Sequence, residues 1–261
     1  MIKKGFRLAL CLLFISISTQ CWAKEMGQKL FDGFIGETNP EWGEMILDGP
    51  PDESGRIRHI YIDLKGADIG GVRIDRITVE GYDVVLTSPD TWGTEEANVL
   101  SVLSTNAVAV IKEEDINSHL KSKEFGDDES WNNLHLDFSP GKVYAKGYYL
   151  ADLKLFKLNI LIEIDGTFKV VGGRQIWLDD YKLKVNRAKV PDGLTDRAME
   201  KIQPILDLSR FIFPIKLSQV VLDDEKAVIE SIRKPEGFEG LRFEYLKDLN
   251  GKVSPDYEPK E

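Results

Sequence analysis

Side chains that commonly bind metals or act as acid–base catalysts are scarce in this chain. It contains three histidines and two cysteines. His59, His119 and His135 stand far apart in sequence, and no HExxH motif or Cys/His cluster includes any of them. A metal site requires several ligands that converge on one ion. We therefore expect structural or surface histidines, no bound metal and no cofactor.

Carboxylates are abundant, with 44 Asp and Glu residues, but their spacing does not indicate a site. Three acidic clusters occur, at 127–129, 179–180 and 223–225. None has the alternate-residue spacing of a calcium-binding loop. Each falls where a turn is expected, which favours solvated turn residues. A pair of carboxylates that meets only in space, as in glycoside hydrolases, stays an open alternative.

Common enzyme motifs are absent from the sequence. There is no GxSxG nucleophile elbow, no GxxxxGK[ST] phosphate loop and no GxGxxG dinucleotide fingerprint. The glycine pairs Gly70-Gly71 and Gly172-Gly173 are better explained as strand bends. We predict that the protein is not an enzyme and has no catalytic residues, with an undetected secreted hydrolase as the remaining enzymatic alternative.

The first 23 residues have the three parts of a secretory signal peptide. Lys3, Lys4 and Arg7 are followed by an apolar run over residues 8–17 and by a small residue, Ala23. The apolar run is shorter than the roughly 20 residues of a membrane anchor. We expect cleavage after Ala23 and a soluble, periplasmic or otherwise extracytoplasmic protein. The alternatives are a lipoprotein acylated at Cys21, which Gln20 disfavours, and an uncleaved anchor.

Cleavage after residue 23 would also leave the mature chain without cysteine, because Cys11 and Cys21 both lie in that segment. It would change the formal net charge from −10 to −13, since it removes three basic residues and no acidic ones. Such a field repels nucleic acids and anionic membranes. We expect no nucleic-acid partner and at most transient membrane contact, while protein partners stay unknown.

The rest of the sequence alternates between strand patterns and short amphipathic segments. Residues 25–35 predict a helix, residues 36–55 a loop, and residues 58–64 a half-buried strand. Residues 150–165 predict one long strand bent at Leu155-Phe156, where the apolar positions change from odd to even. Asp165-Gly166 then predicts a hairpin turn.

Other turns and helices complete this prediction. Ser139-Pro140-Gly141 predicts a hairpin turn, and Tyr181, Leu183 and Val185 predict another alternating strand. Helices are predicted at about 112–123 and 192–203, the second with Leu194, Ala198 and Ile202 on one face. The pattern indicates an α+β protein with a strongly curved, mostly antiparallel sheet wrapped around a few helices.

Two segments resemble a known family. Val108–Leu120 is a strand followed by a helix with the order acid-Asp-hydrophobic-Asn-x-x-Leu. The segment 190–222 has a helix, a Pro204-x-x-Asp-Leu208 step and a closing strand pattern. Both resemble the LmeA-like phospholipid-binding proteins, a bacterial family. The resemblance covers about residues 57–232, and Lys112 departs from the small residue that usually precedes the first helix.

The resemblance implies a fold similar to tubular lipid-binding proteins and non-enzymatic binding, with possible transport, of a phospholipid or another acyl-chain lipid in the cell envelope. It implies that inward apolar side chains contact the acyl chains. The candidates are Ile116, Leu120, Leu158, Ile160, Ile162, Ile164, Leu194, Ala198 and Ile202. The alternative is a structural or protein-interaction module of the envelope with a filled core and no ligand.

The expected organisation has four parts. A signal peptide occupies residues 1–23, and an N-terminal helix and loop occupy residues 24–55. A curved-sheet, lipid-binding-like domain occupies residues 56–232, and a polar C-terminal extension occupies residues 233–261.

Overall fold

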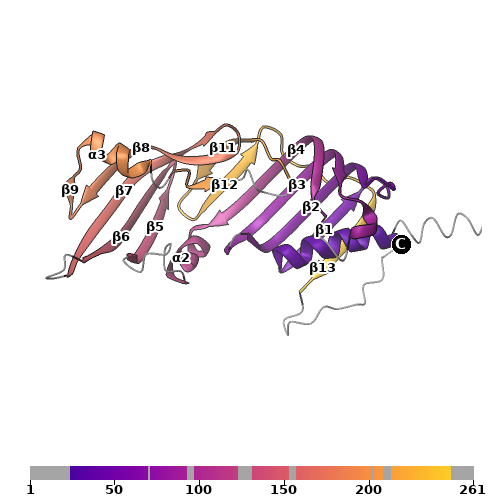
Figure 1. Ribbon diagram of the computed structural model, residues 1–261, viewed down its shortest axis with the longest axis horizontal. Coiled ribbons are helices and arrows are strands. Elements are labelled where there is room, and N and C mark those ends of the chain that lie inside the picture. Colours follow the sequence, from indigo (N-terminus) through magenta and orange to yellow (C-terminus); the bar gives the residue numbers. More distant parts are fainter. Residues whose placement is uncertain are drawn as a thin grey trace, which may run out of the picture. The chain divides into compact units, whose positions relative to one another are not determined.

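A computed structural model describes residues 24–69, 71–92, 97–122, 131–152, 157–200, 203–207 and 213–247. Strands predominate over helices and form two antiparallel sheets, which confirms the α+β class (Figure 1). The predicted signal peptide, the cleavage site after Ala23 and the bend at Leu155-Phe156 lie outside the described residues. No helix among the described residues is long and apolar enough to cross a membrane.

The strands have the following bounds and order. The seven-stranded sheet contains β11 (Leu217–Leu222), β12 (Lys226–Ser231), β4 (Val99–Lys112), β3 (Val72–Leu86), β2 (Arg56–Ile69), β1 (Trp42–Leu47) and β13 (Leu241–Leu246). The six-stranded sheet contains β10 (Leu206–Asp207), β8 (Gln175–Val185), β7 (Lys157–Val171), β6 (Lys142–Asp152) and β5 (Trp131–Ser139), with β9 (Ala188–Lys189) paired to β8. The helical segments are residues 24–38, η1 (Pro89–Thr91), α2 (Glu113–Ser122) and α3 (Asp192–Met199).

The chain divides into two compact units. The first unit contains the residues up to 63, residues 80–105 and the residues from 236 onward. The second unit contains residues 64–79 and 106–235, and it includes the whole six-stranded sheet with α2 and α3.

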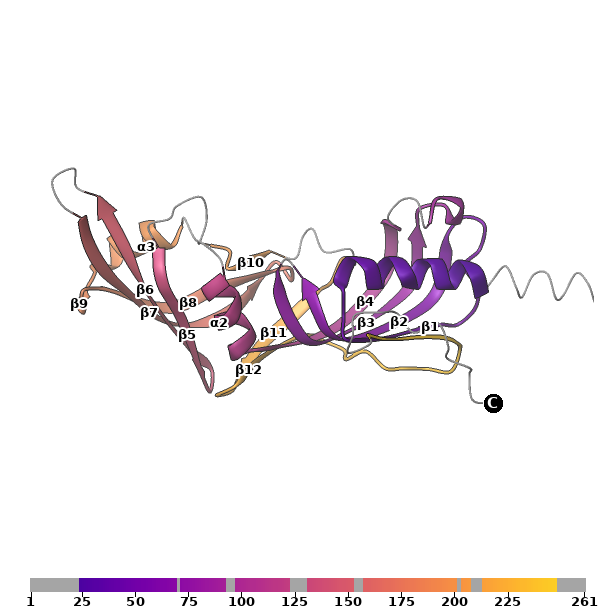
Figure 2. The ribbon, with the colours of Figure 1, turned by 90° about the horizontal axis from the view of Figure 1, so that it is seen from below.

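An amphipathic helix begins the described chain, as predicted. It covers residues 24–38, and Met26, Leu30, Phe31 and Phe34 are all buried. Figure 2 shows it lying along one face of the strands in the first unit. Apolar residues at this helical spacing bury one face of the helix against the sheet.

The prediction of a loop over residues 36–55 is wrong in its middle, where β1 forms. Three consecutive apolar residues, Met45, Ile46 and Leu47, are buried there, so both faces of the strand are covered. The surrounding glycines, prolines and acids hide this short strand in the sequence. Its partner is β13, which lies inside the predicted polar extension and pairs antiparallel from Trp42 with Leu246 onward.

Phe243 of β13 is buried and lies 6.3 Å, centroid to centroid, from the ring of Phe31 on the N-terminal helix. A side chain at Gly27 would collide with the same Phe243 ring. The two ends of the described chain therefore pack on each other within the first unit.

The long strand predicted over residues 150–165 is wrong, because the chain reverses between β6 and β7. These strands pair antiparallel, and Asp152 lies opposite Lys157. The Asp165-Gly166 turn is also wrong, since β7 continues through both residues to Val171. A Cβ at Gly166 would lie 2.9 Å from Leu178 Cγ on β8, so the glycine permits close packing inside the sheet.

Two turns of the six-stranded sheet contain glycines with positive φ. Gly141, at φ 71°, closes the predicted turn between β5 and β6, which confirms it. Gly172 and Gly173, at φ 60° and 70°, form the turn between β7 and β8. Only glycine reaches such φ values without steric cost.

The two predicted helices are confirmed with shorter bounds, as α2 and α3. Among the described side chains of α3, Met199 and Thr195 are buried, whereas Leu194 is 56% exposed. Leu194, the first residue of the predicted apolar face of α3, is therefore exposed in this structure. The helix ends at Met199, four residues before the predicted end, so the i+8 position Ile202 falls beyond it.

Candidate functional site

One face of the six-stranded sheet is apolar across four strands. Residues opposite each other in paired strands point to the same side of a sheet. The row through Ile164 joins β5 to β8, and it consists of Leu136, Ala145, Ile164 and Leu183. The next row places Ile162 between Gly147 and Val185.

The apolar rows continue toward the start of β7. Ile160 lies opposite Tyr149, and Leu158 lies opposite Ala151. The intervening residues of β7 point to the other side, because side chains alternate along a strand. The alternation predicted for the even positions of this segment is thus realised as one continuous apolar face.

A filled core covers one end of this face. Its buried members come from the sheet, from α3 and from β11 and β12, and partly buried side chains surround them. The buried cluster is Phe138, Val143, Leu178, Met199, Leu222 and Ala227, and the side chains packed against it are Ile116, Leu136, Ile164, Phe168, Tyr181 and Val220.

The other end of the face is open to solvent. Ile162 and Ile160 are half-buried, and Leu158 is 43% exposed. The apolar row therefore runs from Ile164, which packs against the core, through the half-buried Ile162 and Ile160 to the exposed Leu158. An apolar row that leaves a packed core without being covered is suited to contact an apolar ligand.

The structure brings together most of the predicted lipid-contacting residues. Ile164 and Ile116 meet at the core cluster, and Leu120 is half-buried on α2. Leu194 is exposed on α3. The side chain of Ala198 and the whole of Ile202 lie outside the described residues.

Residues of the second unit that the sequence did not assign to the core include Phe168, Leu178 and Met199. A bulge in β8 explains part of this omission. Two residues of β7, Asp165 and Thr167, face the three-residue step from Lys182 to Asp179 on β8. The extra residue switches the side-chain alternation, so Leu183 and Leu178 reach the same face despite opposite parity.

Asn117 fastens α2 to the free edge of β5. Its Nδ2 donates to the Leu136 carbonyl at 2.7 Å, and its Oδ1 accepts from the Leu136 amide at 2.8 Å. The side-chain amide thus replaces the neighbouring strand that β5 lacks. Glu113 adds a second contact of this kind, since its Oε2 accepts from the Phe138 amide at 2.6 Å.

Ion pairs within the second unit hold the start of α2 against β3. Arg73 Nη1 lies 3.1 Å from Asp115 Oδ2, and Lys112 Nζ lies 2.8 Å from Asp75 Oδ1. The hydrogen bond from Lys112 lowers the pKa of Asp75 from its ordinary value. Lys112, the residue that departs from the family pattern, therefore contributes an ion pair at the strand–helix junction.

Gln203 repeats the Asn117 arrangement at the opposite side of the sheet. Its Oε1 accepts from the Leu178 amide at 3.1 Å, and its Nε2 donates to the Leu178 carbonyl at 2.8 Å. This contact falls between the short stretches of β8 that pair with β9 and β10. Both family-like segments thus contain an amide side chain that satisfies an unpaired strand edge.

The reverse face of the sheet carries charged side chains near its middle. Cross-strand neighbours there include Asp165 with Lys182 and Glu163 with Lys184. Lys184 Nζ also lies 3.3 Å from Asp165 Oδ2. The basic residues of β8 therefore belong to a solvated strand face, opposite the apolar rows.

Tyr144 gives this polar face a measurable signature. Burial and the hydrogen bond from its hydroxyl to Glu163 Oε1, 2.8 Å long, raise the pKa of Tyr144 to about 12. The protonated phenol is favoured in the folded state, so its contribution to stability is complete below about pH 10 and is lost as the pH rises through 12. Ultraviolet titration of the wild type minus Tyr144→Phe should give a tyrosinate midpoint near 12, and a midpoint near 10 would contradict this environment.

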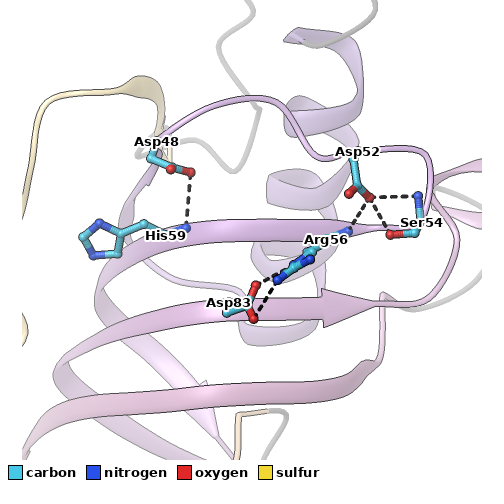
Figure 3. Close-up of polar contacts among 6 residues, drawn as sticks. All are labelled: Asp48, Asp52, Ser54, Arg56, His59 and Asp83. Carbon is cyan, nitrogen blue, oxygen red and sulfur yellow. Dashed lines mark hydrogen bonds and ion pairs between the residues drawn. The ribbon is translucent and has the colours of Figure 1, made fainter.

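A separate polar cleft of about 330 Å³ lies in the first unit. Its lining includes Asp48, Asp52, Arg56 and Arg58. Figure 3 shows that Arg56 makes a two-pronged contact with Asp83, and that Asp52 accepts hydrogen bonds from the turn that follows it. An acyl chain has no favourable partner among these charges, so the apolar face is the better candidate site.

The acidic groups of this cleft are already engaged. The Ser54 hydroxyl and the Arg56 amide lower the pKa of Asp52, and the Arg56 guanidinium lowers the pKa of Asp83. Arg58 Nη2 lies 3.1 Å from Asp48 Oδ2. Throughout the described part of the chain, no three His, Cys, Asp or Glu side chains gather as metal ligands.

One protein-family model matches this chain. The family model described as LmeA-like phospholipid-binding matches residues 53–231, which is more than half of the chain. The matched range includes the complete six-stranded sheet, α2 and α3. Comparisons with curated proteins and with solved structures give no match.

Proposed function

The chain belongs to the LmeA-like phospholipid-binding family, and from this membership we propose that the apolar face of its six-stranded sheet binds the acyl chains of a phospholipid or a similar lipid. The family description supports a lipid ligand and a non-enzymatic role. The choice of face comes from the geometry of the second unit. We further propose that transport of the lipid in the cell envelope is the purpose of this binding.

The observation that carries the proposal is the uncovered part of the Leu158–Ile164 row. Ile164 is packed against the core, whereas Leu158 is 43% exposed on the same face of the same strand. An acyl chain laid along this row would remove both its own methylenes and these side chains from water. The curved, tubular arrangement of the family is part of the proposal, because it would enclose the chain.

The energetics permit useful affinity without a strong polar contact. Each buried methylene contributes about 0.8 kcal/mol, so ten contribute about 8 kcal/mol. Ordering the ligand and the side chains costs several kcal/mol, and contacts beyond ten methylenes offset part of that cost. A dissociation constant in the micromolar range corresponds to about 8 kcal/mol, which is within reach.

Lipid uptake by the delipidated protein tests this function. We expect saturable, micromolar binding of a fluorescent phospholipid or fatty acid, and a co-purified lipid in native mass spectra. A filled core predicts the opposite result, namely no uptake of any acyl-chain lipid. That result would support the structural or protein-interaction module instead.

Export completes the proposal. The basic, apolar and small-residue order of residues 1–23 supports cleavage after Ala23 and an extracytoplasmic location. N-terminal sequencing of the exported protein should therefore start at Lys24. A diacylated Cys21 at the N-terminus would instead establish a tethered lipoprotein.

A further inference from the structure

The apolar face opens at one end of the six-stranded sheet, where β7 begins and β8 turns into β9. Asn186 anchors that turn to β7. Its amide donates to the Leu161 carbonyl at 2.8 Å, and its Oδ1 accepts from the Leu161 amide at 3.0 Å. The β8–β9 turn therefore lies beside Leu161, at the same end of the six-stranded sheet as the start of β7 (Figures 1 and 2).

Exposed apolar side chains occur at this end. Leu158 of β7 is 43% exposed, and Leu194 in the first turn of α3 is 56% exposed. α3 follows β9 after two residues, and the Val190 amide donates to the Leu183 carbonyl at 2.9 Å, which keeps the start of the helix close to β8. Leu158 is continuous with the proposed acyl-chain row.

Basic side chains border the same end. Lys157, Arg187 and Lys189 are all exposed. Lys189 lies 3.2 Å from Asp192, and Lys157 lies opposite Asp152 in the β6–β7 pair. Among the side chains that the structure describes, no carboxylate lies within ion-pair distance of Arg187. We call these five residues, Lys157, Leu158, Arg187, Lys189 and Leu194, the sheet tip.

We propose that the sheet tip docks on the surface of a bilayer that contains anionic phospholipid, and that lipid enters the apolar face there. This inference rests on the proposed lipid-binding function. Exposed apolar side chains together with exposed cations at one end of a sheet match a membrane interface, where leucines enter the acyl boundary and lysine or arginine meets phosphate. The overall charge of −10 opposes tight adsorption, so the contact is brief and weakened by salt.

Vesicle sedimentation with the full purified chain tests the docking. Each cation near an anionic surface is worth about fivefold in affinity. We expect binding to vesicles of phosphatidylcholine with phosphatidylglycerol, weaker binding to phosphatidylcholine alone, and at least a twentyfold loss for the double variant Lys157→Glu, Arg187→Glu. Leu194→Ser should also weaken vesicle binding.

Lys142→Glu is the matched control. Lys142 is an exposed cation of the same sheet, but it begins β6 at the β5–β6 turn, the opposite end of that strand from the sheet tip. It should leave vesicle binding unchanged. If Lys142→Glu weakens vesicle binding as much as the double variant does, the loss of binding reflects the total charge of the protein. That result would contradict the proposal that the sheet tip is the docking surface.

A second readout separates this inference from the function on which it rests. Uptake of a monomeric fluorescent fatty acid from solution should be the same in the wild type, in the double variant and in Lys142→Glu. If the wild type takes up the fatty acid but does not bind the anionic vesicles, only the docking surface is wrong. If the wild type takes up no fatty acid, the proposed lipid-binding function fails as well.

Discussion

Replacing Asn117 by alanine is expected to lower the free energy of unfolding by about 2–4 kcal/mol, because the substitution leaves the Leu136 amide and carbonyl without their partners. Asn117 is only 6% exposed, so water does not readily take over these hydrogen bonds. Two lost bonds at about 1–3 kcal/mol each exceed the gain in helix propensity from alanine. Chemical denaturation of the purified protein measures the change.

Ser118→Ala is the control for that experiment. Ser118 neighbours Asn117 on α2, but it is exposed and its hydroxyl donates only to the Glu114 carbonyl in the same helix. Its substitution should change the free energy of unfolding by less than about 0.5 kcal/mol. A similarly small effect of Asn117→Ala would show that the amide does not hold α2 on the sheet.

Gln203→Ala extends the test to the other edge and should cost about 1–3 kcal/mol, since Gln203 is only half-buried. The strands β5 and β8 are separated by β6 and β7, a distance of about 14 Å at the usual strand spacing. Sites this far apart without shared partners behave additively. The double variant should therefore lose the sum of the two single effects.

Replacing Ile160 by asparagine is expected to weaken acyl-chain binding about thirtyfold. Ile160 lies on the apolar face opposite Tyr149, and the change removes two to three methylene contacts worth about 0.8 kcal/mol each. Titration of the delipidated variant with a fluorescent fatty acid measures the affinity. Leu158→Ser, at a more exposed position of the same row, serves if Ile160→Asn does not fold.

Leu161→Asn provides the matched comparison for Ile160→Asn. The two residues are adjacent in β7 and both half-buried, but they point to opposite faces of the sheet. Leu161→Asn should change affinity by less than about threefold. If the two substitutions weaken binding equally, the ligand does not lie on the face that contains Ile160, because a ligand on that face would be affected by Ile160→Asn alone.

Local patterns in the sequence predicted those elements whose causes are local. The acidic first turn at Glu113–Asp115 correctly indicated α2, and Pro140-Gly141 correctly indicated the turn between β5 and β6. The even apolar positions from Leu158 to Ile164 correctly indicated one face of a strand. Each of these signals lies within a few residues of the feature that it specifies.

Features that depend on distant partners could not be predicted in this way. Asp165-Gly166 has the composition of a turn, yet the glycine is required by Leu178 of the adjacent strand. An Asp-Gly dipeptide occurs both in hairpin turns and where two strands approach each other closely. A sequence pattern does not distinguish them until the pairing of β7 with β8 is known.

The same reasoning applies to the candidate site. Asn117 and Gln203 lie within the family-like segments, but their partners are 19 and 25 residues away along the chain. Nothing local indicates that either amide satisfies a strand edge. On α3, a helix of only eight residues, apolar spacing alone did not distinguish the exposed Leu194 from the buried Met199.

The pairing of β1 with β13 sets an order of events during synthesis. Trp42 lies opposite Leu246. The backbone groups on this edge of β1 therefore gain their hydrogen-bond partners only after β13 has been synthesised. The helix of residues 24–38 likewise gains the contact between Phe31 and Phe243 only after β13 has been synthesised. Contacts this remote in sequence form late, after the intervening chain has been made. The first unit therefore reaches its final form only once residue 246 has left the ribosome.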